Sequence, residues 1–106
     1  MKAIFVYVAA PNKAEARDIA RAAVEARLAA CANIVPGVTS LYRWKGKIAQ
    51  GREVVLLLKT RKNHFKALSA LIRQRHSAQT PCIVALPLHD GDKEFIKWIF
   101  AETGGG

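Results

Sequence analysis

The alternation of apolar and polar residues divides the chain into strand-like and helix-like segments. Residues 2–9 are rich in β-branched and aromatic types and stop before Pro11, which predicts a strand. Asn12 then suits a helix N-cap, with Glu15 three residues later at capping-box spacing. Apolar residues recur at helical spacing to about Ala30, namely Ile19, Ala20, Ala23, Val24 and Leu28. We therefore expect a strand followed by an amphipathic helix.

The middle of the chain, residues 33–60, predicts a long β-hairpin. Pro36 and Gly37 near its start indicate a bend or bulge within the first strand. Two places fit the reversing turn, residues 45–47 and residues 49–51. Residues 53–59 then predict an unbroken apolar strand.

A second helix and another strand follow the hairpin. Asn63 suits the N-cap of this helix. Its apolar stripe consists of Phe65, Leu68, Leu71 and Ile72. Pro81 ends a short connection, and residues 83–88 predict the fourth strand.

A short third helix is expected after Asp90-Gly91. Its expected buried side consists of Phe95, Trp98 and Ile99. Thr103 and the glycine tail, residues 104–106, are expected to be disordered.

The predicted order is β-α-β-β-α-β-α, which gives an α+β fold. It is the ferredoxin-like split β-α-β arrangement with one added helix and a long β-hairpin. A single domain over residues 1–103 is expected, with an antiparallel sheet that carries its helices on one face.

The second face of this sheet is also predicted to be apolar. Val54, Leu56 and Leu58 point to one side of their strand, whereas Val55 and Leu57 point to the other. At about 25 cal/mol per Å² of apolar surface, several exposed side chains of this kind would forgo several kcal/mol. We therefore expect self-association across this face. The alternative is that the last helix covers part of it.

The long hairpin is the second reason to expect an assembly. Strands of about five or six residues are usual, and this hairpin extends well beyond the rest of its sheet. Such an overhang is expected to add to the sheet edge of a neighbouring subunit. The expected interface residues are Leu41, Tyr42, Trp44, Phe5 and Tyr7.

Charge and cysteine content narrow the choice of partners. Seventeen Lys and Arg against eight Asp and Glu give a formal charge of +9, which predicts at most weak, non-specific binding of polyanions. Two cysteines are too few for a secreted disulfide scaffold. The N-terminal apolar run has no convincing signal cleavage site, and no apolar stretch approaches the roughly 20 residues that span a bilayer. We expect a cytoplasmic protein that does not bind membranes.

Several longer segments resemble the CutA proteins, also called divalent-cation tolerance proteins. The run from Arg27 to Ile48 (RLAACANIVPGVTSLYRWKGKI), the later VVLLLKT, the strand IVALPL and the terminal KWI occur in the order seen in that family. The resemblance covers nearly the whole chain. It implies a ferredoxin-like subunit in a compact homotrimer akin to the PII signalling proteins. It also implies a link to copper and other divalent metals, without an established enzymatic activity.

One segment departs from the family pattern. Family members usually have His-Pro-Tyr-Glu, a variable residue and Pro-Glu before the last strand. Here His76 and Pro81 remain, but Ala78, Gln79 and Cys82 replace the tyrosine and the two carboxylates.

The candidate metal ligands are His76, Cys82 and, from a subunit contact, Cys31. Thiolates and imidazoles suit Cu(I) or Zn(II), so a copper or other metal site that is not needed for folding is the prediction. The alternative is that both cysteines are small buried hydrophobes. His64 and His89 are expected to be solvated.

Four other functions are alternatives to metal binding. No glycine-rich phosphate loop or nucleophile elbow is present, so an enzyme is not expected. The element order is also that of RNA-recognition motifs, but residues 54–58 are aliphatic where base-stacking aromatics are needed, which argues against specific nucleic-acid binding. The remaining alternatives are a trimer that binds a small anion in intersubunit clefts through Arg43, Lys45 and Arg75, and a structural partner-binding trimer.

Overall fold

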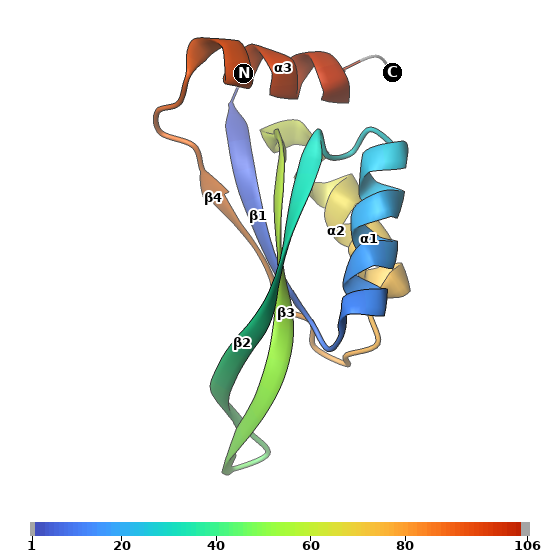
Figure 1. The fold of residues 1–106 in the computed structure, drawn as a ribbon, viewed down its shortest axis with the longest axis vertical. Helices are drawn as coiled ribbons and strands as arrows, with labels where there is room; N and C mark the ends of the chain where they lie inside the picture. Colours follow the sequence, from blue (N-terminus) through green and yellow to red (C-terminus); the bar gives the residue numbers. More distant parts are fainter. Residues whose placement is uncertain (1, 105–106) are drawn as a thin grey trace.

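A computed structural model describes residues 2–104 (Figure 1). The elements in chain order are β1 (Ala3–Ala10), α1 (Lys13–Glu25), β2 (Cys31–Trp44), β3 (Lys47–Arg61), the 3₁₀ turn η1 (Lys62–His64), α2 (Phe65–Arg75), β4 (Ile83–Pro87) and α3 (Lys93–Thr103). The strand order is β2-β3-β1-β4, and each neighbouring pair is antiparallel. The predicted α+β fold and its β-α-β-β-α-β-α order are confirmed.

The helices divide between one face and one end of the sheet. α1 and α2 both lie on the right-hand side of the sheet in Figure 1, and α3 crosses its upper end. Arg61, which shares the opposite face with Phe5 and Tyr7, binds α3 at this end. The last helix therefore covers the upper end of the opposite face and leaves the rest of it open, so the alternative to self-association holds only for that end.

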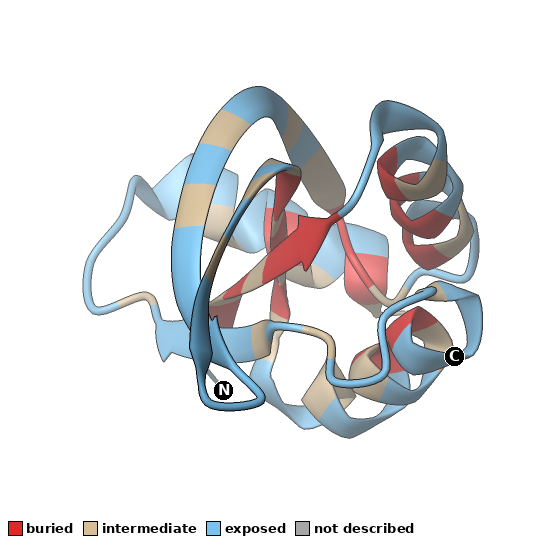
Figure 2. Ribbon diagram, turned by 90° about the horizontal axis from the view of Figure 1, so that it is seen from below, coloured by how far each residue is buried: buried red, intermediate tan, exposed pale blue. Residues whose placement is uncertain are grey.

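The core lies between the sheet and the two helices α1 and α2. Figure 2 shows the buried residues on the central strands and on the inward sides of the helices. The fully buried side chains of this layer are Val6, Val8, Leu56, Leu58, Ile19, Leu68 and Ile72. They come from the alternate strand positions and helical stripes that the sequence pattern marked. Val24, which was counted in the stripe of α1, is instead exposed.

The start of α1 follows one half of the predicted capping box. The Asn12 side chain accepts a hydrogen bond from the Glu15 backbone N–H at 2.8 Å, as predicted for an N-cap. The other half is absent, because the Glu15 carboxylate binds Ser77 instead of returning to the Asn12 backbone.

The end of α1 was predicted about five residues too late. The helix ends at Glu25, and Arg27 has a φ of +60°. The Ala30 N–H already donates to the Lys59 carbonyl at 2.8 Å, so residues 26–30 lead into the sheet. The Leu28 and Ala29 N–H groups donate to the Ala23 carbonyl at 3.0 and 3.2 Å, so the chain leaves the helix at Arg27 before it pairs with β3.

The hairpin contains both irregularities that its sequence suggests. The pairing of β2 with β3 shifts register between Val35 and Val38, which confirms the bulge at Pro36-Gly37. Trp44 pairs with Lys47, so Lys45-Gly46 is the turn and residues 49–51 are not. Figure 1 shows the hairpin extending well below the helices.

The second helix starts differently from the prediction. Asn63 is not its N-cap, because it lies inside η1 and His64 precedes α2 without a side-chain cap. His64 is also not simply solvated, since its Nε2 lies 2.6 Å from the Thr103 carbonyl oxygen. The contact with α3 therefore holds the His64 side chain, which the sequence predicted to be solvated.

The buried side of α3 also differs from the prediction. Phe95 and Trp98 are exposed and stack on each other with ring centroids 5.7 Å apart, whereas Ile99 and Thr103 are buried. Thr103 is therefore the ordered last residue of α3, contrary to the expected disorder; Gly105 and Gly106 lie outside the described residues.

Cationic side chains from other elements hold the C-terminal end of α3. The Arg61 guanidinium donates to the Thr103 hydroxyl at 3.1 Å and to the Phe100 carbonyl at 2.6 Å. Arg27 donates to the Ala101 carbonyl at 3.1 Å. Free carbonyls at a helix C-terminus carry partial negative charge, so these contacts favour the observed docking of α3.

Candidate functional site

The face of the sheet away from α1 and α2 is an apolar surface, here called the open face. The strand register places Tyr7 opposite Leu57 on β3 and Val84 on β4. The neighbouring row joins Phe5 to Leu86. Val84 and Leu86 are 49% and 47% exposed in the single chain, although both are large aliphatic residues in a strand. Surfaces of this kind usually contact another protein.

A hollow of about 500 Å³ lies on the open face where the hairpin leaves the sheet. Its aromatic wall consists of Tyr7, Tyr42 and Trp44, and Ala78, Gln79 and Thr80 lie beside it. The other lining residues are Ala9, Ser40, Glu53 and Cys82. The hollow thus gathers four predicted site residues, Tyr7, Tyr42, Trp44 and Cys82, from separate parts of the chain.

Cys82 lies exposed at the edge of this hollow, just before β4. Its carbonyl accepts a hydrogen bond from the Ala9 N–H at 3.3 Å, which fixes the backbone beside β1. Partial burial, and then the nearby Glu53 carboxylate, raise the pKa of the Cys82 thiol. Both effects disfavour the thiolate, so Cys82 is a neutral thiol at neutral pH unless a cation replaces the proton.

Cys31 lies on the same face but at the opposite edge of the sheet. It is half-buried and pairs with Lys59 of β3. Strands β3 and β1 separate it from the edge where Cys82 lies. Three strand spacings of about 4.8 Å place the two cysteines at least roughly 14 Å apart, which excludes a disulfide within one chain. Neither cysteine is fully buried, so the alternative of small core residues does not describe them.

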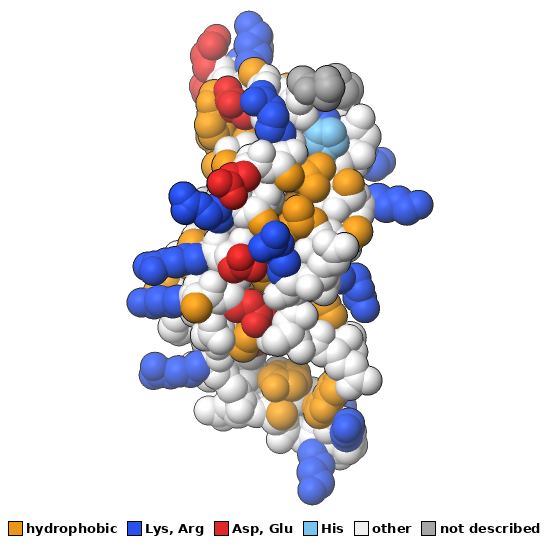
Figure 3. Space-filling model, turned by 90° about the vertical axis from the view of Figure 1, so that its right-hand side faces the viewer, with side chains coloured by type: hydrophobic (Ala, Val, Ile, Leu, Met, Phe, Trp, Pro, Cys, Tyr) orange, Lys and Arg blue, Asp and Glu red, His pale blue; other side chains and the backbone are white. Residues whose placement is uncertain are grey.

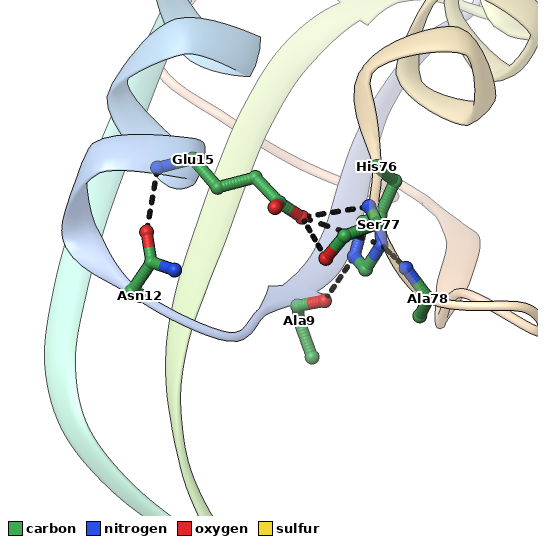
Figure 4. A network of polar contacts seen from close by, with 6 residues as sticks. All are labelled: Ala9, Asn12, Glu15, His76, Ser77 and Ala78. Carbon is green, nitrogen blue, oxygen red and sulfur yellow. Dashed lines mark hydrogen bonds and ion pairs between the residues drawn. The ribbon is translucent and has the colours of Figure 1, made fainter.

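His76 is tied into the fold by both of its ring nitrogens (Figure 4). Nε2 donates to the Ala9 carbonyl at 2.7 Å, and Nδ1 accepts from the Ala78 N–H at 3.0 Å. The Glu15 carboxylate lies 3.6 Å from Nδ1 and accepts from both the N–H and the hydroxyl of Ser77. The His76 side chain is only 2% exposed. It would have to break one of these bonds to bind a metal.

The predicted metal ligands do not meet within one chain. Within residues 2–104, no three His, Cys, Asp or Glu side chains form a group that could hold a metal ion. The predicted ligand set of His76, Cys82 and Cys31 includes Cys31 from a neighbouring subunit. A single chain therefore does not test it, and the set stays a prediction.

The predicted anion-binding residues are also separated in one chain. Arg43 and Lys45 lie at the tip of the hairpin, where the Lys45 ammonium is 6.0 Å from the centre of the Trp44 ring. Arg75 lies at the end of α2 and binds the Asp18 carboxylate at 2.9 Å. The hollow beside the hairpin is lined by Glu53 and by no Lys or Arg.

Leu41 is the one predicted interface residue that faces away from the open face. Leu41 pairs with Gln50 of β3, and Ile48 lies two residues before Gln50 on the same side of that strand. Leu41 and Ile48 are 68% and 71% exposed. The overhanging hairpin therefore presents apolar side chains on both of its faces.

Comparison with known proteins identifies the family of this chain. The model of the CutA1 divalent ion tolerance proteins matches residues 4–102. This chain belongs to the CutA1 family. The CutA protein of Thermus thermophilus is 44% identical over 99 residues, which is 93% of this chain and 96% of that protein. The CutA protein of Yersinia pestis is also 44% identical, over 93% of this chain and 83% of its own length.

Solved CutA structures have the same fold. The Thermus thermophilus protein superposes with a TM-score of 0.94 at 43% identity, over 96% of this chain and 99% of its own. CutA1 of Oryza sativa gives a TM-score of 0.95 at 35% identity, over 100% of this chain and 97% of its own. The predicted resemblance to CutA is confirmed, and CutA proteins are generally regarded as non-enzymatic.

Sequence reasoning missed Glu53 as a member of this CutA site. It lies on the open face in line with Val55 and Leu57, and its carboxylate acts on the Cys82 thiol. The available signal was a lone carboxylate at an alternate position of an apolar strand. Its nearness to Cys82 could not be read from the sequence, because β3 and β4 are not neighbours in the sheet.

No helix within residues 2–104 is long and apolar enough to cross a membrane.

Proposed function

We propose that this CutA chain acts as a non-enzymatic homotrimer that binds copper or another heavy-metal ion at its subunit contacts. The observation that carries the proposal is an apolar open face with a thiol at each of its two edges. The relatives with 44% identity bear the name divalent-cation tolerance protein, which supports the metal-linked role.

The open face supports the assembly part of the proposal. Phe5, Tyr7, Val84 and Leu86 lie on it without a covering helix, and Tyr42 and Trp44 extend the surface along the hairpin. At about 25 cal/mol per Å², covering these side chains favours association by several kcal/mol. A closed ring of three subunits covers such a face in every copy.

The positions of the cysteines support the metal part. When the β2 edge of one subunit meets the β4 edge of the next, Cys31 of the first approaches Cys82 of the second. Two thiolates suit a soft ion such as Cu(I). A bound cation offsets the burial and the Glu53 charge that keep Cys82 protonated. His76 contributes only if it gives up its bond to Ala9 or Ala78.

Native mass spectrometry under reducing conditions, with and without Cu(I), tests both parts. The expected result is a trimer that takes up copper, and a Cys31→Ser/Cys82→Ser variant that stays trimeric and loses it. His89→Gln is the control, because His89 is an exposed imidazole outside the hollow that contains Cys82. A double-serine variant that binds copper as tightly as the parent would contradict the proposed metal site. A parent protein with the mass of a monomer would contradict the proposed trimer.

The alternative of a small anion in intersubunit clefts has less support. Arg75 is already paired with Asp18, and the hollow beside the hairpin contains a carboxylate. Phosphate that raises the thermal stability of the double-serine variant as much as that of the parent would support this alternative.

The compartment is a separate part of the proposal. A solved CutA structure from Archaeoglobus fulgidus is named as periplasmic, whereas we place this chain in the cytoplasm, where two unpaired thiols stay reduced. Fractionation of cells that express the native gene tests this placement.

A further inference from the structure

Positive charge is unevenly distributed along this chain. From Val54 to His89 there are six Lys and Arg residues and not one Asp or Glu, whereas the whole chain has 17 and eight. This stretch includes the end of β3 and all of α2 and β4. The acids lie elsewhere, and Figure 3 shows them from the upper end to the middle of the face that contains α1, with Lys and Arg among them, at its edges and at the hairpin end.

Three of the six cations are already engaged. Lys59 donates to the Asn33 side chain on the open face, Arg61 holds α3, and Arg75 binds Asp18. The other three are Lys62, Lys66 and Arg73. Within the described residues, none of these three has a carboxylate within 4.0 Å.

The three unengaged cations lie on the outer side of α2 and the turn before it. Leu68 and Ile72 point into the core, so the opposite side of α2 faces outward. The exposed residues of α2 are Lys66, Ala67, Ala70, Arg73, Gln74 and Arg75, of which Arg75 is paired with Asp18. Lys66 and Arg73 are seven residues apart, which places them on one side of the helix about 10 Å from each other. Ala67 and Ala70 have short side chains, so no bulky group projects between Lys66 and Arg73.

Lys2 adds a fourth cation beside this helix. A hollow of about 580 Å³ lies between the start of α2 and the sheet edge, and Lys2, Lys62 and Lys66 all line it. Asn63 supplies a neutral polar group there, and no acid lines the hollow. We call Lys2, Lys62, Lys66 and Arg73 the α2 basic face.

The residues of this face indicate which polyanion it suits. One aromatic, the half-buried Phe65, lines the hollow, and the exposed positions of α2 carry none, so a row of bases has no stacking platform there. The exposed side of α2 also has no large exposed apolar residue, which a helix needs to insert into a membrane surface. What remains is a low, acid-free row of cations, which matches the phosphates along a double helix.

We propose that the α2 basic face docks on the sugar-phosphate backbone of duplex nucleic acid, without reading its sequence. Four phosphate contacts predict a slope of about −3.6 in a plot of log affinity against log salt concentration. The affinity then falls about 150-fold between 50 and 200 mM salt, from a dissociation constant in the non-specific range of about 10⁻⁴ to 10⁻⁶ M. None of these four residues is a predicted metal ligand, although the hollow that three of them line borders the β4 edge that the proposed subunit contact uses.

Fluorescence anisotropy with a short labelled DNA duplex, over a series of salt concentrations, tests this proposal. The variant Lys62→Ala/Lys66→Ala/Arg73→Ala is expected to bind more weakly at low salt and to reduce the slope to about −0.9. The matched control is Lys13→Ala/Arg17→Ala/Arg21→Ala, which removes the same charge from exposed positions of α1. The control is expected to keep the parent's slope. Circular dichroism confirms that both variants fold.

Four results overturn the proposal. A parent protein that does not bind the duplex is the first. Equal losses in the two variants would show that only the net charge matters. A loss in Arg43→Ala/Lys45→Ala/Lys47→Ala that exceeds the loss in the α2 variant would assign the binding to the hairpin tip. Tighter binding of a single strand of the same length would indicate base stacking instead of backbone contact.

Discussion

Most polar side chains discussed above have hydrogen-bond partners, and one buried hydroxyl lacks one. His76 uses both ring nitrogens in fixed contacts, and Asn12 caps α1. Thr60 is the opposite case. Its hydroxyl is fully buried on β3 and has no hydrogen-bond partner within the described part of the chain. A buried polar group without a partner costs free energy, so Thr60 weakens the fold locally.

Replacing Thr60 with valine is therefore expected to stabilise the protein. Thr60→Val removes the unpaired hydroxyl and keeps the branched shape, which is expected to raise the free energy of unfolding by about 1 kcal/mol. Urea denaturation followed by circular dichroism measures this change. The control is Thr60→Ser, which keeps the hydroxyl and loses the methyl group, and it is expected to destabilise. A Thr60→Val protein less stable than the parent would contradict this account.

The strands, α1 and the hairpin turn begin where local sequence rules place them, but α2 starts later than predicted, and other elements end or face differently. The N-cap of α1, the bulge in β2 and the stripe of α2 were predicted from spacing alone. The end of α1 and the exposed side of α3 were not. Beyond the helix, the Ala30 N–H pairs with Lys59, and Arg61 and His64 hold α3 against the rest of the fold. These contacts join segments that are distant in sequence, so no local pattern contains them.

The hairpin turn offers a test at the level of one element. Gly46 has a φ of +78°, a conformation that costs other residues about 1–2 kcal/mol. Gly46→Ala is expected to destabilise the hairpin by about 1 kcal/mol, seen as a lower urea midpoint and faster amide exchange near the turn. Gly51→Ala is the matched control, because Gly51 lies in the same hairpin with no positive φ and no atom near the added methyl group. Equal losses in both variants would argue against turn strain.

The whole molecule is elongated by its hairpin, with extents of 44 × 26 × 22 Å. One face carries α1 and α2, and the open face carries apolar residues of all four strands. Within residues 2–104, the helices leave most of this face uncovered. Association of identical subunits would cover it, which is the basis of the proposed trimer.

Trp44 provides the test at this largest scale. Trp44→Ala is expected to weaken the assembly, lowering its mass at micromolar concentration, because an exposed aromatic on an overhanging hairpin acts as an interface anchor. The far-ultraviolet circular dichroism of the subunit is expected to persist. The control is Val24→Ala, which trims an exposed apolar residue of α1 on the helix-covered side. A Trp44→Ala assembly with unchanged mass and thermal stability would exclude this role.

Local periodicity was enough to predict the strands, the helices and the two apolar faces of the sheet, because each depends on residues at most a few positions apart. The resemblance to CutA was likewise readable from contiguous segments. The arrangement of the candidate site was not. That Cys31 and Cys82 lie at opposite edges of one face, with Glu53 beside Cys82, depends on strand order. That His76 is fully hydrogen-bonded depends on where α2 meets β1. Such facts come from packing between distant segments, which residue spacing along a chain does not encode.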